Sequence, residues 1–165
     1  MPNNPTAYTP QELRSAFGRF ATGVTIVTCR GPNGEPVGLT CNSFASLSLT
    51  PPLVLWSLRQ HSPSVAAFVA ASHFAVNVLA EDQVDLSRHF SSSVADKFSE
   101  GRWHDGAGGA PVLEGAVARF ECRQHQRHDA GDHVLFIGEI ERLTEAALPP
   151  LVFQAGHYRL IGEIL

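Results

Sequence analysis

The sequence predicts a mainly β fold, a closed or nearly closed antiparallel barrel with short helices at its periphery. Short runs of β-branched and aromatic residues recur along the chain, and turn signals such as GPNGEP at 31–36 separate them. Amphipathic helical patterns are few and short. At 165 residues the chain has the length of one domain. We expect that domain at 11–165, after a flexible N-terminal tail at 1–10.

The elements of the N-terminal half follow from periodicity and turn signals. A helix is expected at 11–21, because Thr9 suits an N-cap, Pro10 suits the first turn, and Leu13, Phe17 and Phe20 share one stripe. After it we expect strands at 23–29, 37–40, 51–58 and 73–80, and helices at 62–72 and 81–90.

The C-terminal half carries the clearest β signal. Residues 91–111 are rich in Ser and Gly, and a polar stretch of this length is typical of a functional loop. In the strand expected at 116–128, Ala118, Phe120 and Cys122 alternate with charged residues. Further strands are expected at 134–143, 151–154 and 158–164.

Composition excludes several classes of function. The net charge of -4 offers no basic excess for nucleic acid, and no apolar run approaches the roughly 20 residues that cross a membrane. The first ten residues do not have the pattern of a secretory signal, so the cytoplasm is the expected location. Three cysteines without a CxxC spacing favour free, buried thiols over disulfides or zinc.

His125, His128 and His133 form the only local histidine cluster and raise the question of a metal site. In a strand, side chains three residues apart point to opposite faces, which separates His125 from His128. If even-numbered residues of both strands face the core, the loop between the strands holds an odd number of residues, which puts His128 and His133 on opposite faces. We therefore expect no metal, surface positions for His125 and His128, and a hairpin turn with Gly131 at positive φ.

Two polar segments are candidates for binding. Residues 38–52 place Thr40, Asn42, Ser43, Ser46 and Ser48 between two apolar strands, suited to a polar planar ligand or simply to a Ser/Thr-rich loop. Residues 57–64 bring serines and an arginine to an expected helix N-terminus, which suits a phosphate or plain helix capping. Motifs of hydrolases, P-loops and Rossmann folds are absent from the sequence. These patterns together indicate a small barrel that binds a phosphate-bearing ring compound.

Seven segments in a fixed order carry a family resemblance. They are FATGVTIVT (20–28), GLTCNSFASLSLTPPLVLWSL (38–58), FAVNVLA (74–80), DKFS (96–99), PVLEGAVARFEC (111–122), AGDHVLFIGEI (130–140) and PLVFQAGHY (150–158). From about residue 17 to 160 the chain resembles the short-chain flavin reductases of the flavin reductase-like domain. These are reductase components of two-component flavin-dependent monooxygenases.

The resemblance implies an FMN-binding split β-barrel, antiparallel and Greek-key-like, that forms a homodimer. It implies an NAD(P)H:flavin oxidoreductase: NADH or NADPH delivers hydride to N5 of FMN or FAD, and the reduced flavin diffuses to a separate oxygenase. The preferred flavin and nicotinamide, the oxygenase and its substrate stay open. One alternative is a flavin- or haem-binding split-barrel carrier or sensor without reductase activity, and another is a metal protein that uses the three histidines.

The resemblance also assigns site residues. Thr40, Asn42 and Ser43 would lie along the isoalloxazine, where Thr40 and Asn42 help to stabilise negative charge near N1. Cys41 replaces a more usual alanine there. His133 would position the nicotinamide, with Tyr158 as a weaker candidate. The ribityl chain, the phosphate and the lid over the ring would involve Ser46, Ser57, Leu58, Arg59, His61, Ser62, Phe90, Lys97 and Phe98.

Overall fold

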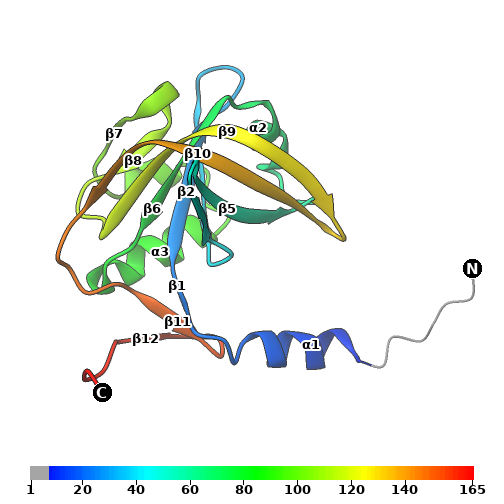
Figure 1. Ribbon diagram of the computed structural model, residues 1–165, viewed down its shortest axis with the longest axis vertical. Coiled ribbons are helices and arrows are strands. Elements are labelled where there is room, and N and C mark those ends of the chain that lie inside the picture. Colours follow the sequence, from blue (N-terminus) through cyan, green and yellow to red (C-terminus); the bar gives the residue numbers. More distant parts are fainter. Residues whose placement is uncertain (1–7) are drawn as a thin grey trace, which may run out of the picture.

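The computed structural model describes residues 8–165 and shows a mainly β architecture, as the sequence predicts (Figure 1). Most of the tail expected at 1–10 lies outside the described residues. A seven-stranded antiparallel sheet has the order β3-β2-β6-β9-β10-β5-β4. Its strands are β2 (Thr25–Arg30), β3 (Pro36–Cys41), β4 (Ala45–Leu49), β5 (Pro52–Arg59), β6 (His73–Val78), β9 (Ala118–Ala130) and β10 (His133–Glu145).

The sheet is curled, and the chain connection at its edges explains why. The edges of a flat seven-stranded sheet would lie about 29 Å apart, at about 4.8 Å per strand. The edge strands β3 and β4 are nevertheless joined by residues 42–44 alone, which span at most about 14 Å. The two edges therefore approach each other without pairing. This open seam is the split of the barrel, and it places residues 40–43 there.

The edge strand β4 was not expected. The sequence predicts one polar segment at 38–52 between two strands, whereas β3 continues to Cys41 and β4 occupies Ala45–Leu49. Its residues are mostly exposed, and Ser46 lies opposite Val54 of β5. Its apolar residues do alternate with Ser46 and Ser48, but Ala45, Leu47 and Leu49 are all exposed, so the alternation does not mark a face buried in the core.

Two small sheets complete the β structure. One contains β1 (Thr22–Gly23), β11 (Val152–Gln154) and β12 (His157–Arg159), and the other pairs β7 (Trp103–Asp105) with β8 (Pro111–Leu113). The pair β7–β8 lies inside 91–111, which we expected to be a loop throughout. Short 3-10 turns at Lys97–Ser99 and Ala107–Gly109 fill much of the rest.

The helices are shorter than expected. They are α1 (Pro10–Phe17), α2 (Val65–Ala70) and α3 (Val84–Ser91), the last preceded by a 3-10 turn at Glu81–Gln83. Thr9 and Glu12 form a capping box at the start of α1, as the N-cap assignment predicts. No helix among residues 8–165 is long and apolar enough to cross a membrane.

Of the apolar stripe expected on the first helix, Leu13 and Phe17 lie on α1 and Phe20 lies beyond its end, and none of the three is buried within residues 8–165. Helix α1 extends away from the sheet (Figure 1) and buries none of its residues. Phe17 and Phe20 are 72% and 78% exposed.

Aromatic packing fills the curled sheet. Trp56 of β5 stacks on Phe136 of β10 at 4.7 Å between ring centroids, and it meets Phe68 of α2 edge-on at 4.8 Å. A second apolar cluster holds α3 against the sheet through Phe90, which also contacts Phe98 and Trp103. Part of the expected loop at 91–111 therefore belongs to the core.

The turn of the β9–β10 hairpin corrects one expectation. The loop holds only Gly131 and Asp132, an even number of residues, and Gly131 has φ 60° as the first central residue of a type II′ turn requires. His128 pairs with Leu135, which shares a face with His133. The prediction that His128 and His133 lie on opposite faces is therefore wrong.

A bulge, rather than the loop, brings the core faces of the two strands together. The register shifts after Ile137, where His125 has no partner in the ladder, and Cys122 then lies opposite Ile140 as expected. His125 and His128 are exposed, as predicted. Residues 8–165 contain no group of three or more His, Cys, Asp or Glu side chains able to hold a metal ion.

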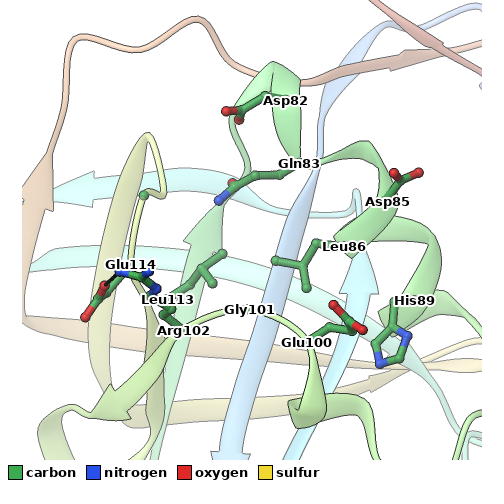
Figure 2. Close-up of a pocket in the computed structure, with 11 residues that line it drawn as sticks. Asp82, Gln83, Asp85, Leu86, His89, Glu100, Gly101, Arg102, Leu113 and Glu114 are labelled. Carbon is green, nitrogen blue, oxygen red and sulfur yellow. Dashed lines mark ion pairs between the residues drawn. The ribbon is translucent and has the colours of Figure 1, made fainter.

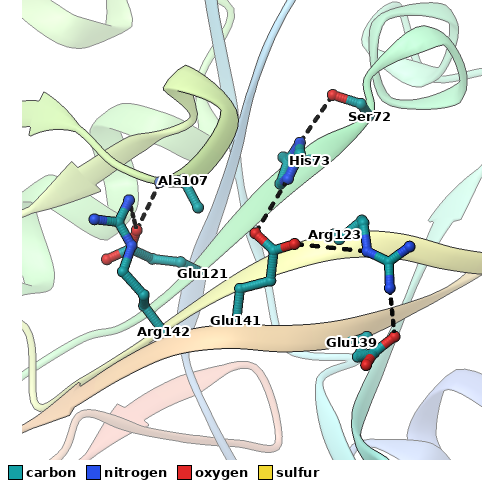
Figure 3. Close-up of polar contacts among 8 residues, drawn as sticks. All are labelled: Ser72, His73, Ala107, Glu121, Arg123, Glu139, Glu141 and Arg142. Carbon is teal, nitrogen blue, oxygen red and sulfur yellow. Dashed lines mark hydrogen bonds and ion pairs between the residues drawn. The ribbon is translucent and has the colours of Figure 1, made fainter.

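Away from the turn, charged side chains of β9 and β10 form ion pairs and hydrogen bonds with each other and with neighbouring elements (Figure 3). The buried Glu121 accepts a hydrogen bond from the Ala107 amide at 2.6 Å and forms an ion pair with Arg142 at 2.8 Å. Glu141 lies between His73 at 3.2 Å and Arg123 at 3.5 Å. These contacts hold the 3-10 turn at Ala107–Gly109 and β6 against β9 and β10.

Candidate active site

The seam between β3 and β4 opens into a cavity of about 810 Å³. Its walls come from the ends of β3 and β5, the residues leading into α2, the end of α3 with the serines after it, and the first residue of β10. This volume lies within the range of cofactor sites, about 300 to 1,000 Å³.

Most of the predicted site residues line this cavity, although they come from distant parts of the chain. They are Thr40, Cys41, Asn42, Ser43, Ser57, Leu58, Arg59, His61, Ser62, Phe90, Lys97 and His133. Their proposed contacts with flavin and nicotinamide stay predictions.

Three predicted residues lie elsewhere. Ser46 is exposed on β4. Phe98 packs edge-on against Phe90 at 5.1 Å and borders a neighbouring cavity. Tyr158 lines a smaller cavity of about 250 Å³, which it shares with Thr40. Tyr158 and His133 therefore do not line the same cavity.

Ser43 uses its hydroxyl for structure. Its Oγ donates to the Ser57 carbonyl at 3.0 Å and accepts from the Ser57 amide at 2.9 Å, while Cys41 Sγ lies at 3.1 Å. Ser57 lies beyond Leu55, the last β5 residue paired with β4. The hydroxyl therefore takes the place of a missing strand partner, and it has little capacity left for a ligand.

The hydroxyl hydrogen of Thr40 is also used in a hydrogen bond within the protein. Thr40 Oγ1 donates to the carbonyl oxygen of Ser87 at 2.7 Å. In this geometry the hydrogen of the Thr40 hydroxyl points away from the cavity. A role for Thr40 in stabilising charge near N1 stays a prediction, and this hydrogen bond does not favour it. Asn42 is exposed and forms no side-chain hydrogen bond within the described chain, which leaves its amide free for a ligand.

The cavity is cationic. Arg59, His61 and Lys97 line it, whereas the described lining residues include no Asp or Glu. Lys97 Nζ donates to the Phe90 carbonyl at 2.9 Å, close to the end of α3. Loss of hydration on burial lowers the pKa of Lys97.

His133 stands at the rim, opposite Arg59 in the β5–β10 pairing. Its Nδ1 lies 2.7 Å from Asp132 Oδ1. This hydrogen bond, together with the charge of a protonated imidazole, lowers the pKa of Asp132. An Nδ1–H donated to Asp132 leaves Nε2 available for a ligand.

The residues leading into α2 form a weaker phosphate site than expected. The helix has only six residues, and its N-cap Ser64 makes no side-chain capping bond. A phosphate here would depend on hydroxyls and cations rather than on a long helix dipole.

The sequence analysis missed several lining residues. Ser91 ends α3, Ser92 and Ser93 follow it, and all three line the same cavity, whereas the sequence predicts a functional loop from residue 91 without naming them as site residues. Ser87 was also missed. It lies three residues after Val84 and three before Phe90, so a serine on the apolar stripe of this helix was the available signal.

A second cavity, of about 690 Å³, has the opposite character (Figure 2). Leu86 and Leu113 point into it, and its rim carries Asp82, Asp85, Glu100 and Glu114, with Arg102 4.0 Å from Glu114. Anionic nucleotides are disfavoured there because like charges repel.

Comparisons with known proteins identify the family of the chain. Residues 17–162 match the family model described as flavin reductase like domain. The FMN reductase (NADH) SmoA of Agrobacterium fabrum is 44% identical over 162 residues, which cover 96% of this chain and 92% of that protein.

Two further proteins extend the comparison. The reductase component of a flavin-dependent trigonelline monooxygenase from Acinetobacter baylyi is 44% identical over 90% of this chain, which spans about half (48%) of that protein. An NADH:FAD oxidoreductase from Streptomyces globisporus, solved with NAD and FAD fragments, superposes with a TM-score of 0.88 at 40% identity, covering 92% of each chain. The chain therefore belongs to the flavin reductase like domain family.

Proposed function

We propose that this protein is an NAD(P)H:flavin oxidoreductase that supplies reduced flavin to a separate monooxygenase. The observation that carries the proposal is the cationic cavity at the barrel seam, which gathers residues from β3, β5, α3 and β10. NADH is the proposed donor, since the names of two similar proteins specify it.

The cavity residues fit a flavin in size and chemistry. A volume of about 810 Å³ admits a ring system together with part of a nucleotide. The exposed Asn42 amide offers both a donor and an acceptor to a polar ring edge. Arg59 and Lys97 supply positive charge for a phosphate.

A bound flavin would supply the hydride-accepting ring, so the chain needs no acid–base side chain for the transfer itself. Its residues bind and orient. The walls of the cavity would hold the flavin and nicotinamide rings in contact, and Asn42 with backbone amides would stabilise negative charge on the flavin ring. His133, oriented by Asp132 through its Nδ1–H, would accept a hydrogen bond at Nε2 from the carboxamide NH2 of the nicotinamide.

Anaerobic stopped-flow mixing tests the proposal. Purified protein with FMN or FAD should bleach the visible flavin band rapidly on addition of NADH, faster than without protein. A lack of acceleration with both flavins and with both NADH and NADPH would refute reductase activity. A carrier or sensor would instead retain a coloured ligand through purification and leave NADH unoxidised.

We further propose that the protein works as a homodimer in the cytoplasm, where NADH is available. The support for a dimer is the apolar face of α1, which is covered by nothing in the described chain. Phe17→Asp and Phe20→Asp should convert a dimer to a monomer in size-exclusion chromatography with light scattering. A monomeric unsubstituted protein at micromolar concentration would refute the dimer.

A further inference from the structure

Two hydrogen bonds that meet at Ser87 of α3 connect Tyr158 of β12 to Thr40 at the cationic cavity. Thr40 Oγ1 donates to the Ser87 carbonyl at 2.7 Å, and Ser87 Oγ lies 2.8 Å from the Tyr158 hydroxyl oxygen. Ser87 is completely buried. Of these three residues, only Thr40 lines the cationic cavity at the barrel seam.

The direction of the first hydrogen bond decides what Thr40 offers a ligand. A hydroxyl carries one hydrogen and two acceptor lone pairs. Because that hydrogen points to the Ser87 carbonyl, only the lone pairs of Thr40 Oγ1 remain for the cavity. At this position the wall accepts hydrogen bonds and does not donate them.

Tyr158 is placed to keep this arrangement fixed. Its ring packs edge-on against Phe153 at 5.5 Å, and the Arg88 guanidinium lies 5.4 Å from the ring centre. Its hydroxyl is the one partner of the Ser87 side chain within the described chain. Without it, a buried hydroxyl must turn to the carbonyls of its own helix, which bends helices and would shift the Ser87 carbonyl.

We propose that Tyr158 is a positioning residue which, through Ser87, presents the Thr40 hydroxyl as an acceptor-only contact for a ring N–H. The inference rests on the proposed function and deepens it. The oxidised isoalloxazine ring has a single N–H, at N3, between two carbonyls. An acceptor-only Thr40 matches that N–H and is mismatched with either carbonyl.

FMN and its N3-methyl derivative test this match, because methylation removes the N–H. Each is titrated into the protein, and Kd is measured by flavin fluorescence. Unsubstituted protein should prefer FMN. Thr40→Val keeps the shape of the side chain, so the N3-methyl group of the derivative meets the same space as in the unsubstituted protein. The preference for FMN over the derivative should nevertheless fall by about tenfold, because roughly one hydrogen bond is lost. Thr40→Ser should retain the preference.

Tyr158→Phe removes only the hydroxyl and should lower the preference for FMN several-fold. Tyr8→Phe is the matched control, since Tyr8 is the other tyrosine and is largely exposed. Added to Thr40→Val, Tyr158→Phe should cause no further loss of preference, whereas a merely structural role would add one. Thermal unfolding of each variant without flavin checks its fold.

The outcomes separate the two proposals. If unsubstituted protein binds neither FMN nor FAD, the proposed function fails and this inference fails with it. If it binds FMN but Thr40→Val retains the full preference over the N3-methyl derivative, only the inference is overturned. Identical behaviour of Tyr158→Phe and Tyr8→Phe likewise overturns the role of Tyr158.

Discussion

The two large cavities of this protein are similar in size and opposite in charge. The cavity at the barrel seam, about 810 Å³, carries arginine, lysine and histidine, whereas the cavity between α3 and β8, about 690 Å³, carries mainly carboxylates. Volume alone therefore does not identify the nucleotide site. Charge distinguishes the two cavities, because flavin and nicotinamide nucleotides are both anionic.

Charge reversal should break this comparison most strongly. Lys97→Glu places a carboxylate in the seam cavity and should raise the Kd for FMN by about 100-fold through repulsion of the phosphate. Fluorescence titration measures it. Arg102→Glu makes the same change in the acidic cavity and should alter Kd less than about twofold. Equal effects of the two would show that charge does not select the cavity.

Because Lys97 also donates to the Phe90 carbonyl, a second variant separates its two contributions. Lys97→Met keeps the length of the side chain and removes the charge. A rise in the Kd for FMN that is smaller than that of Lys97→Glu, with an unchanged melting temperature, would assign the effect to the charge of Lys97 and not to its hydrogen bond with Phe90.

His133→Ala tests the rim of the seam cavity and should have the next largest effect. Loss of one hydrogen bond to the nicotinamide nucleotide should raise KM for NADH about tenfold and change the Kd for FMN much less. His128→Ala is the control, since His128 lies on the same hairpin, is exposed and is absent from the cavity wall. Equal losses of both affinities would contradict the assigned role.

Ser43→Ala should affect stability more than binding. The substitution leaves the Ser57 amide and carbonyl without their partner, at a cost of about 1 to 3 kcal/mol in the free energy of unfolding. Urea denaturation measures it. Ser46→Ala on the exposed edge strand should cost less than about 0.5 kcal/mol. A large rise in flavin Kd without destabilisation would instead make Ser43 a flavin ligand.

The smallest effect is expected for chemical modification of Cys29 and Cys122, which line neither cavity. Burial raises the pKa of Cys29 and of Cys122 to about 12, so both stay protonated and unreactive at pH 8. Ellman's reagent should therefore modify Cys41 alone in the folded protein, and flavin should slow that reaction. All three cysteines should react after unfolding. Rapid modification of more than one thiol in the folded protein would contradict this placement.

The sequence by itself determined the strand-rich fold, the seven ordered family segments and most residues that line the seam cavity. Its local patterns succeed where one face of an element is buried, since periodicity records burial. They fail for β4, whose alternating apolar residues are exposed rather than buried, and for the paired strands within 91–111.

Only the tertiary structure decided how the side chains use their hydrogen bonds. Thr40, Asn42 and Ser43 look alike as small polar residues in one segment. The Thr40 hydroxyl donates its hydrogen to a backbone carbonyl, the Ser43 hydroxyl both donates to and accepts from Ser57, and the Asn42 amide forms no side-chain hydrogen bond within the described chain. Their partners, Ser87 for Thr40 and Ser57 for Ser43, are distant in sequence. The β4–β5 hairpin places Ser43 opposite Ser57, and the packing of α3 on β3 brings Ser87 to Thr40. A local pattern does not record contacts between residues so far apart along the chain.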